Sequence, residues 1–268
     1  TYTGAIGFGG PGRDDEPRWV FNVGIRTVLI DRSSKMAWYG TGGGITYDSE
    51  PDTEYREAML KTEVLERRSS DFSLLETIRW DDGFHLLDRH LERLQASAEH
   101  FGIPLDEEAV VEALRRAVGD GPLRVRLTVR RDGAIGVTTG PLPRAAGPVR
   151  LAIDRVPIEP DDPFLRHKTT RRRVYDAARG RHPDADDVVL VTGGEQITET
   201  TIANIAVRIG DTWFTPPVDA GCLPGVERVE LLARGELVER KLTTRDLREA
   251  DAIARINSVR GWEPAEII

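Results

Sequence analysis

One lysine stands within a run of arginines in the second half of the chain. The segment FLRHKTTRRR, residues 164–173, places Lys168 between Arg166 and Arg171. A lysine amine reacts as a nucleophile only when it is deprotonated, and neighbouring cations together with partial burial lower a lysine pKa. Two interpretations remain open from this segment alone: a solvated basic helix start, or an amine prepared for covalent chemistry.

The composition excludes several classes of protein. The chain has 268 residues, 39% of them apolar, and a formal net charge of −8. The negative charge argues against a general nucleic-acid binder, and no apolar run reaches membrane-spanning length. The single cysteine, Cys222, excludes an intramolecular disulfide and a cysteine-only zinc site, so we expect a cytoplasmic protein. Because the chain begins without methionine inside a strand-like pattern, we expect a piece of a longer protein.

The elements that would position Lys168 alternate between strands and helices. Residues 1–48 predict short strands with glycine turns, residues 50–68 a helix, and residues 69–72 a linker. SLLETIRWDDGFHLLD then predicts a strand, an Asp-Gly turn and a strand. Helices are expected at residues 89–103, 105–119, 171–180, 225–235 and 243–250. Other stretches predict strands, including a hairpin at residues 123–139 and a last strand at residues 252–259. We therefore predict an α+β fold with two domains, residues 1–68 and 69–268.

Four stretches of the second domain together resemble fold-type IV pyridoxal phosphate enzymes. This family includes branched-chain aminotransferases, D-amino-acid aminotransferases and aminodeoxychorismate lyases. The stretches are LLDRHLERLQASAEHFGI, HKTTRRRVYDAAR, GEQITETTIANIAV with CLPGVER, and NSVRGW. They occur in the order that the family has. The resemblance implies two small subdomains with pyridoxal 5'-phosphate between them, and by analogy a homodimer.

The resemblance assigns one part of the cofactor to each motif. Lys168 would bond to the aldehyde, and Glu199 would keep the pyridine nitrogen protonated. Arg93 would bind the phosphate, since a guanidinium offers a fork of donors. Backbone N–H groups at two sites would add to the phosphate site: Val226, Glu227, Ser258 and Val259. The alternative for Glu199 is a glutamate at a strand end that faces solvent, and the alternative for Arg93 is an exposed charge on a helix. We expect His90 and His167 to pack in the core or to support the site.

The same cofactor site serves a lyase and an aminotransferase. ETIRW resembles a lyase segment in which a threonine, here Thr77, lies near the lysine and relays a proton. Arg171 and Arg173 stand where branched-chain aminotransferases often have asparagine and tyrosine, which fits an anionic substrate. We expect aminodeoxychorismate lyase, which forms 4-aminobenzoate and pyruvate in folate biosynthesis. A branched-chain or D-amino-acid aminotransferase is the alternative, and an inactive remnant that binds a partner is the third possibility.

The first 65 residues resemble the C-terminal end of aminodeoxychorismate synthase component I, a chorismate-binding enzyme. The matching pieces are YTGAIG, FNVGIRT and YGTGGGITYDSEPDTEYREAMLK. The resemblance implies a vestigial chorismate site, with Glu57 as a Mg²⁺ ligand and Glu54 one helical turn away. Because the upstream part of such a domain is absent, we expect this segment to be unable to make aminodeoxychorismate. The juxtaposition indicates a fused synthase–lyase, whose full-length synthase would have a glutamine amidotransferase partner. The other residues of the vestigial site are Tyr2, Arg26, Gly42, Gly43, Gly44 and Lys61.

Overall fold

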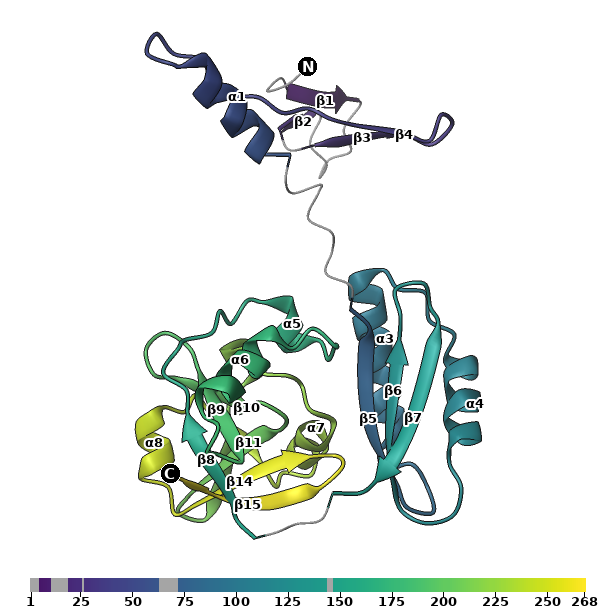
Figure 1. Cartoon of the computed structure of the whole chain (residues 1–268), viewed down its shortest axis with the longest axis vertical. Helices are drawn as coiled ribbons and strands as arrows, with labels where there is room; N and C mark the ends of the chain where they lie inside the picture. Colours follow the sequence, from purple (N-terminus) through teal and green to yellow (C-terminus); the bar gives the residue numbers. More distant parts are fainter. Residues whose placement is uncertain (1–4, 11–18, 26, 63–71, 144–146) are drawn as a thin grey trace. The chain divides into compact units, whose positions relative to one another are not determined.

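The computed structural model describes residues 5–10, 19–25, 27–62, 72–143 and 147–268. The chain divides into two compact units, Thr1–Asp71 and Phe72–Ile268 (Figure 1). Among the described residues, no helix is long and apolar enough to cross a membrane.

The first unit consists of two hairpins and one helix. Strand β1 (Ala5–Gly9) pairs antiparallel with β2 (Trp19–Val23), and β3 (Val28–Asp31) pairs antiparallel with β4 (Met36–Tyr39). Helix α1 (Pro51–Leu60) follows, with Pro51 at its first turn, where a proline costs no hydrogen bond. The predicted helix of residues 50–68 therefore ends at Leu60 within the described residues. No side chain of this unit whose exposure is described is buried.

The second unit begins with a three-stranded sheet that two helices cover. The sheet has the order β5 (Leu74–Trp80), β6 (Leu123–Val129), β7 (Ile135–Pro141), all antiparallel. Amphipathic helices α3 (Leu87–Phe101) and α4 (Glu107–Ala117) bury their apolar faces in its core. The predicted strand after the Asp-Gly turn is wrong. Only an isolated bridge joins Trp80 to Phe84, and α3 starts soon afterwards, because Leu86 adopts a left-handed conformation at its N-cap.

An eight-stranded sheet forms the rest of the second unit, in the order β10-β9-β8-β15-β14-β11-β12-β13. Apolar side chains alternate between its two faces. In β9, Val188 and Leu190 pack with α6, while Val189 and Val191 face the opposite core. The strands are β8 (Val149–Ile153), β9 (Asp187–Val191), β10 (Ile197–Thr200), β11 (Asn204–Ile209), β12 (Thr212–Thr215), β13 (Val238–Glu239), β14 (Ala252–Asn257) and β15 (Gly261–Ile267).

Helices pack on both faces of this large sheet. They are α5 (Pro163–Arg166), α6 (Arg173–Arg181), the 3-10 turn η1 (Val218–Ala220), α7 (Val226–Ala233) and α8 (Thr244–Arg248). α6 packs on β9 and α7 packs on β14. The prediction that residues 252–259 form the last strand is wrong, because β15 follows and pairs with both β14 and β8.

Candidate active site

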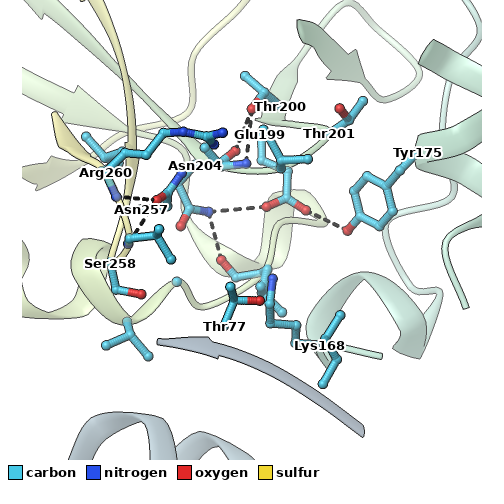
Figure 2. Close-up of a pocket in the computed structure, with 18 of the residues that line it drawn as sticks. Thr77, Lys168, Tyr175, Glu199, Thr200, Thr201, Asn204, Asn257, Ser258 and Arg260 are labelled. Carbon is cyan, nitrogen blue, oxygen red and sulfur yellow. Dashed lines mark hydrogen bonds between the residues drawn. The ribbon is translucent and has the colours of Figure 1, made fainter. Parts of the chain in front are cut away.

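One cavity of about 320 Å³ lies in the second unit, lined from both of its sheets (Figure 2). Strand β5 contributes Leu75 and Thr77, which share one face of the strand because side chains alternate. Further lining segments come from the loops and strand ends of the large sheet. They include Lys168, Glu199–Asn204, Val226 and Asn257–Arg260.

Lys168 is half-buried and lines this cavity, in an extended segment between α5 and α6. Its carbonyl accepts a hydrogen bond from the N–H of Leu75 at 3.0 Å, which fixes the segment against β5. Burial and the nearby charges of Arg93 and Arg172 lower the pKa of the Lys168 amine, Glu76 opposes them, and the result is a pKa of about 8. At pH 7 roughly one such amine in ten is therefore neutral, compared with fewer than one in a thousand at the ordinary pKa.

The two arginines expected to act on Lys168 face elsewhere. Arg166 pairs with Asp161 at 3.2 Å, and the guanidinium of Arg171 lies over the ring of Phe164, 4.2 Å from its centroid. The sequence predicted correctly that cations lower the pKa of Lys168 but was wrong about which ones. Arg93 and Arg172 lower this pKa in place of Arg166 and Arg171.

Glu199 is a buried carboxylate at the end of β10. It accepts a hydrogen bond from the Tyr175 hydroxyl at 2.7 Å and one from Asn204 Nδ2 at 3.3 Å. No cation of the described residues forms an ion pair with it. Burial raises the pKa of Glu199 to about 7, against the hydrogen bond from Tyr175 and the charges of Lys168 and Arg172. The alternative of a solvent-facing glutamate is thereby excluded.

Arg93 of α3 reaches the cavity through a buried ion pair. Its Nε donates to Glu76 Oε1 at 2.8 Å, its Nη2 to Glu76 Oε2 at 2.5 Å, and its Nη1 to the Pro224 carbonyl at 3.1 Å. Two of the five N–H donors of a guanidinium thus remain for an anion. Glu76 also accepts from His90 Nδ1 at 2.7 Å. His90 is therefore a buried supporting residue, and His167, at 3.0 Å from Ser97, lies at the edge of the cavity.

The N-terminus of α7 supplies backbone donors at the cavity. Gly225 is the N-cap and Val226 lines the cavity, whereas the Glu227 side chain turns away to His85 at 2.9 Å. A Cβ at Gly225 would lie 1.9 Å from Asn204 Oδ1, so only glycine allows this close approach. The first N–H groups of a helix carry partial positive charge and suit an anion.

Ser258 and Val259 also line the cavity, in the turn between β14 and β15. Asn257 Oδ1 accepts the N–H of Val259 at 3.0 Å and that of Arg260 at 2.9 Å. The Val259 N–H, which the resemblance assigned to the phosphate, is therefore engaged by Asn257. Ser258 remains the donor of this pair that lies at the cavity.

Four arginines line the cavity in addition to Arg93: Arg124, Arg126, Arg172 and Arg260. Within the described chain, the guanidinium groups of Arg124 and Arg126 of β6 form no hydrogen bond or ion pair. Burial, followed by the charges of Arg172 and Arg124, lowers the pKa of Arg126. Such an accumulation of like charges indicates a site for an anionic ligand.

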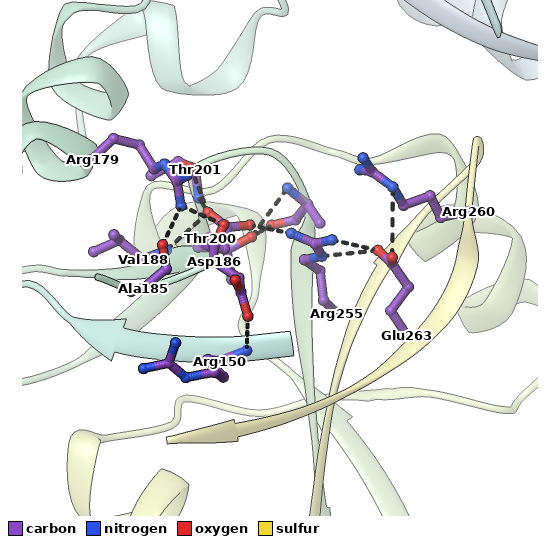
Figure 3. A network of polar contacts seen from close by, with 12 residues as sticks. Arg150, Arg179, Ala185, Asp186, Val188, Thr200, Thr201, Arg255, Arg260 and Glu263 are labelled. Atoms are coloured by element: carbon purple, nitrogen blue, oxygen red, sulfur yellow. Dashed lines mark hydrogen bonds and ion pairs between the residues drawn. The ribbon is translucent and has the colours of Figure 1, made fainter. Parts of the chain in front are cut away.

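Arg172 and Arg260 both contact one buried network. Figure 3 labels its members Thr201, Arg255 and Glu263 together with Arg260. Asp187 accepts from Arg255 at 2.9 Å and from the Thr201 N–H at 3.1 Å, and the Thr201 carbonyl accepts from Arg172. On the other side, Arg255 donates to Glu263 at 2.9 Å, and Glu263 lies 3.5 Å from Arg260. The network fixes both arginines at the cavity wall.

Sequence reasoning missed Glu76, Tyr175 and Asn204. A charged residue inside the apolar pattern LLETI was a signal for Glu76, because an unpaired carboxylate rarely lies in a buried strand. Tyr175 and Asn204 occupy ordinary helix and strand positions, and their contacts depend on the packing of α6 and α7.

The first unit brings some of its predicted residues together. Lys61 Nζ lies 2.8 Å from Glu57 Oε1 and donates to the Gly42 carbonyl at 2.9 Å. A Cβ on Gly43 would lie 3.0 Å from Glu54 Oε2, which places the glycine cluster against α1. Gly44 lies in the same irregular segment, and Tyr2 and Arg26 fall outside the described residues. Within the described ranges, no three acidic, histidine or cysteine side chains gather closely enough to hold a metal ion.

Comparison with known proteins gives two family matches. Residues 73–268 match the amino-transferase class IV family, and residues 1–67 match the chorismate binding enzyme family. A Schizosaccharomyces pombe protein named "Putative aminodeoxychorismate lyase" is 32% identical over 199 residues, 70% of this chain and 86% of that protein. The structure of a "Putative amino-acid aminotransferase" from Mesorhizobium loti is 37% identical with a TM-score of 0.70, covering 74% of this chain and 100% of that one. The structure of 4-amino-4-deoxychorismate lyase from Pseudomonas aeruginosa is 25% identical with a TM-score of 0.61, covering 73% and 82%.

Proposed function

The chain belongs to the aminotransferase class IV family, and from that premise we propose that its second unit is a pyridoxal phosphate-dependent lyase. The proposed reaction converts 4-amino-4-deoxychorismate to 4-aminobenzoate and pyruvate. The observation that carries this proposal is the cavity itself, which is lined by a half-buried lysine and a cluster of arginines.

The residues of the cavity fit the cofactor. Lys168 is half-buried and has a lowered pKa, Glu199 is a buried carboxylate without an ion pair, and Arg93 keeps free donors. The phosphate would be held by Arg93, by the N–H groups of Val226 and Glu227 at the start of α7, and by the Ser258 hydroxyl. Pyridoxal phosphate, when bound, supplies an aldehyde that bonds to amines and a ring that withdraws electrons from the carbon bearing the amine.

Lys168 and Thr77 would carry the proton transfers. A neutral Lys168 amine accepts the proton from the substrate carbon that bears nitrogen, because a base must be unprotonated to act. The hydroxyl of Thr77, on the same cavity wall as Leu75, would hold a proton for the departing pyruvate unit. Glu199 would hold a proton at the ring nitrogen. The products together contain all the atoms of the substrate, so the reaction needs no water and no oxidant.

The arginines favour an anionic substrate. 4-Amino-4-deoxychorismate carries two carboxylates, and Arg124 and Arg126 of β6 offer guanidinium groups without partners among the described residues. A branched-chain amino acid carries only one carboxylate and an apolar side chain, which would leave this cluster uncompensated. The match of residues 1–67 to chorismate binding enzymes supports the same substrate, since a fused synthase would make what the lyase consumes.

An aminotransferase is the second candidate, because the 37% identical structure carries that name. Both candidates use the same cofactor residues, and they differ in product. Incubation of the purified protein with pyridoxal phosphate and 4-amino-4-deoxychorismate should yield 4-aminobenzoate and pyruvate in equal amounts. A keto acid from a branched-chain or D-amino acid, without 4-aminobenzoate, would select the aminotransferase.

Three further properties are part of the proposal. We propose that the protein works as a homodimer in the cytoplasm, and that the first unit alone does not turn over chorismate. A mixture of the protein with chorismate, glutamine, Mg²⁺ and a glutamine amidotransferase should therefore yield no aminodeoxychorismate.

A further inference from the structure

Tyr175 of α6 contacts both a carboxylate and an arginine of the cavity. Its hydroxyl donates to Glu199 Oε1 at 2.7 Å, and the guanidinium of Arg172 lies over its ring, 4.7 Å from the centroid. Figure 2 shows the tyrosine pointing at Glu199. The side chain is 8% exposed and packs in the core between α6 and β9, so its position is fixed independently of any ligand.

The hydrogen bond from the Tyr175 hydroxyl is the shorter of the two that side chains donate to Glu199, and the Leu223 N–H also acts on this carboxylate. Asn204 Nδ2 donates to the other carboxylate oxygen at 3.3 Å, and it also donates to the Leu223 carbonyl at 2.9 Å. A buried carboxylate without an ion pair depends on such donors to hold its charge and its orientation. The charged and titratable groups that act on Glu199 are Lys168, Arg172, Tyr175 and Cys222.

The ring of Tyr175 restrains Arg172 from one side. On the other side Arg172 Nη2 donates to the Thr201 carbonyl, and Thr201 is held by Asp187. An arginine between an aromatic face and a carbonyl loses most of its rotamer freedom before a ligand binds, which improves affinity for an anion.

We propose that Tyr175 is a positioning residue for two parts of the cavity at once. Its hydroxyl orients and stabilises the Glu199 carboxylate toward the cofactor ring nitrogen, and its ring holds Arg172 for a carboxylate of the substrate. The inference rests on the proposed function, because it takes the cavity to hold pyridoxal phosphate and an anionic substrate.

Two substitutions separate the hydroxyl from the ring. Tyr175→Phe removes only the hydroxyl, so we expect the dissociation constant of pyridoxal phosphate to rise about tenfold. The carboxylate becomes harder to ionise, so its pKa rises, and the acidic limb of kcat moves to higher pH by about one unit. Affinity for chorismate, which has both carboxylates of the proposed substrate but no amine, should stay within about twofold because the ring is retained.

Tyr175→Leu removes the ring as well. It should repeat the effects of Tyr175→Phe and also weaken chorismate binding about fivefold, measured by calorimetry on the cofactor-loaded protein. If Tyr175→Leu does not fold, Arg172→Leu replaces it and should weaken chorismate by at least as much while leaving cofactor affinity within about threefold. Thr215→Val is the matched control, because it deletes a buried hydroxyl that bonds the Ile205 carbonyl at 2.8 Å away from the cavity.

The outcomes distinguish this inference from the proposed function. A wild-type protein that does not bind pyridoxal phosphate would refute the proposed function whatever the variants do. A wild-type protein that binds it, with Tyr175→Phe unchanged in cofactor affinity and pH profile, would overturn the role of the hydroxyl. Equal chorismate affinity in the phenylalanine and leucine variants, or in wild type and Arg172→Leu, would overturn the role of the ring. The Thr215→Val control should match wild type in both ligand affinities and in the pH profile of kcat, and equal shifts there would also overturn the inference.

Discussion

The guanidinium of Arg93 lies against the carboxylate of Glu76 as a two-pronged pair, with Nε on Oε1 at 2.8 Å and Nη2 on Oε2 at 2.5 Å. Both side chains are almost fully buried, and His90 donates to the same carboxylate. Burial alone would raise the pKa of Glu76, but the charges of Arg93 and His90 hold it at about 2. The pair therefore orients the arginine that would bind the cofactor phosphate.

Glu76→Gln should weaken pyridoxal phosphate binding and lower stability by about 3–5 kcal/mol, because Arg93 is left buried without its partner. The folded pKa of Glu76 lies below its ordinary value of 4.5. Its contribution to stability is thus complete above about pH 4.5 and is lost as the pH falls toward 2. Urea unfolding between these pH values should show a steeper loss for wild type than for Glu76→Gln. Glu112→Gln, at an exposed pair with Arg116, is the control and should follow wild type.

Gly225→Ala should disturb the cavity by displacing Asn204 or the helix α7, both of which contribute to its wall. The added Cβ would lie 1.9 Å from Asn204 Oδ1, so Asn204 must move away from Glu199 or α7 must shift. We expect a loss of about 1–3 kcal/mol in the free energy of unfolding and weaker cofactor binding. Gly180→Ala is the matched control, since Gly180 is exposed in α6 with nothing near its Cβ position, and it should stabilise the protein slightly. Equal cofactor affinity in the two variants would contradict the close contact between Gly225 and Asn204.

Arg126→Gln should stabilise the ligand-free protein and weaken its affinity for the substrate. Partial desolvation and the neighbouring charges of Arg172 and Arg124 lower the pKa of this exposed side chain and so disfavour its charged form. Removing the charge should raise the melting temperature of the ligand-free protein and raise the KM for 4-amino-4-deoxychorismate about tenfold. Arg130→Gln, at an exposed pair with Asp132, should change neither quantity. A lower melting temperature for Arg126→Gln would show that the arginine has a structural partner.

Asp187→Asn should destabilise the protein far more than Asp186→Asn. Asp187 is fully buried and accepts hydrogen bonds from Arg255, Thr201 and Val188, whereas Asp186 is exposed and accepts one from the Arg150 N–H at 2.8 Å. We expect about 3–5 kcal/mol for Asp187→Asn and about 1 kcal/mol for its neighbour, from chemical unfolding. Similar losses for the two variants would show that the network of Figure 3 is not cooperative.

The sequence predicts the fold class well, because the motifs carry local information. The expected fold-type IV architecture, with its mixed helices and strands and a chorismate-binding segment ahead of it, is confirmed by the family matches. The missed strand β15 contains Gly261 and Pro264, two residues that weaken any strand prediction, and its pairing with β8 joins segments distant in sequence.

The sequence predicted those site residues whose type is dictated by one part of the cofactor. Lys168, Glu199 and Arg93 lie at one cavity although they come from different elements. The cations beside Lys168 were not predictable, because the segment after α5 is extended rather than helical. It pairs with β5 through Leu75, which turns Arg172 toward the cavity and Arg171 toward Phe164.

The most direct test of the central claim is the chemical identity of position 168. Pyridoxal phosphate should be added to the purified protein, the mixture reduced with borohydride, and the digested peptides analysed by mass spectrometry. A single phosphopyridoxyl group on Lys168, absent from Lys168→Arg, is the predicted result. An unmodified Lys168, or a cofactor attached only to an exposed lysine such as Lys241, would contradict the account.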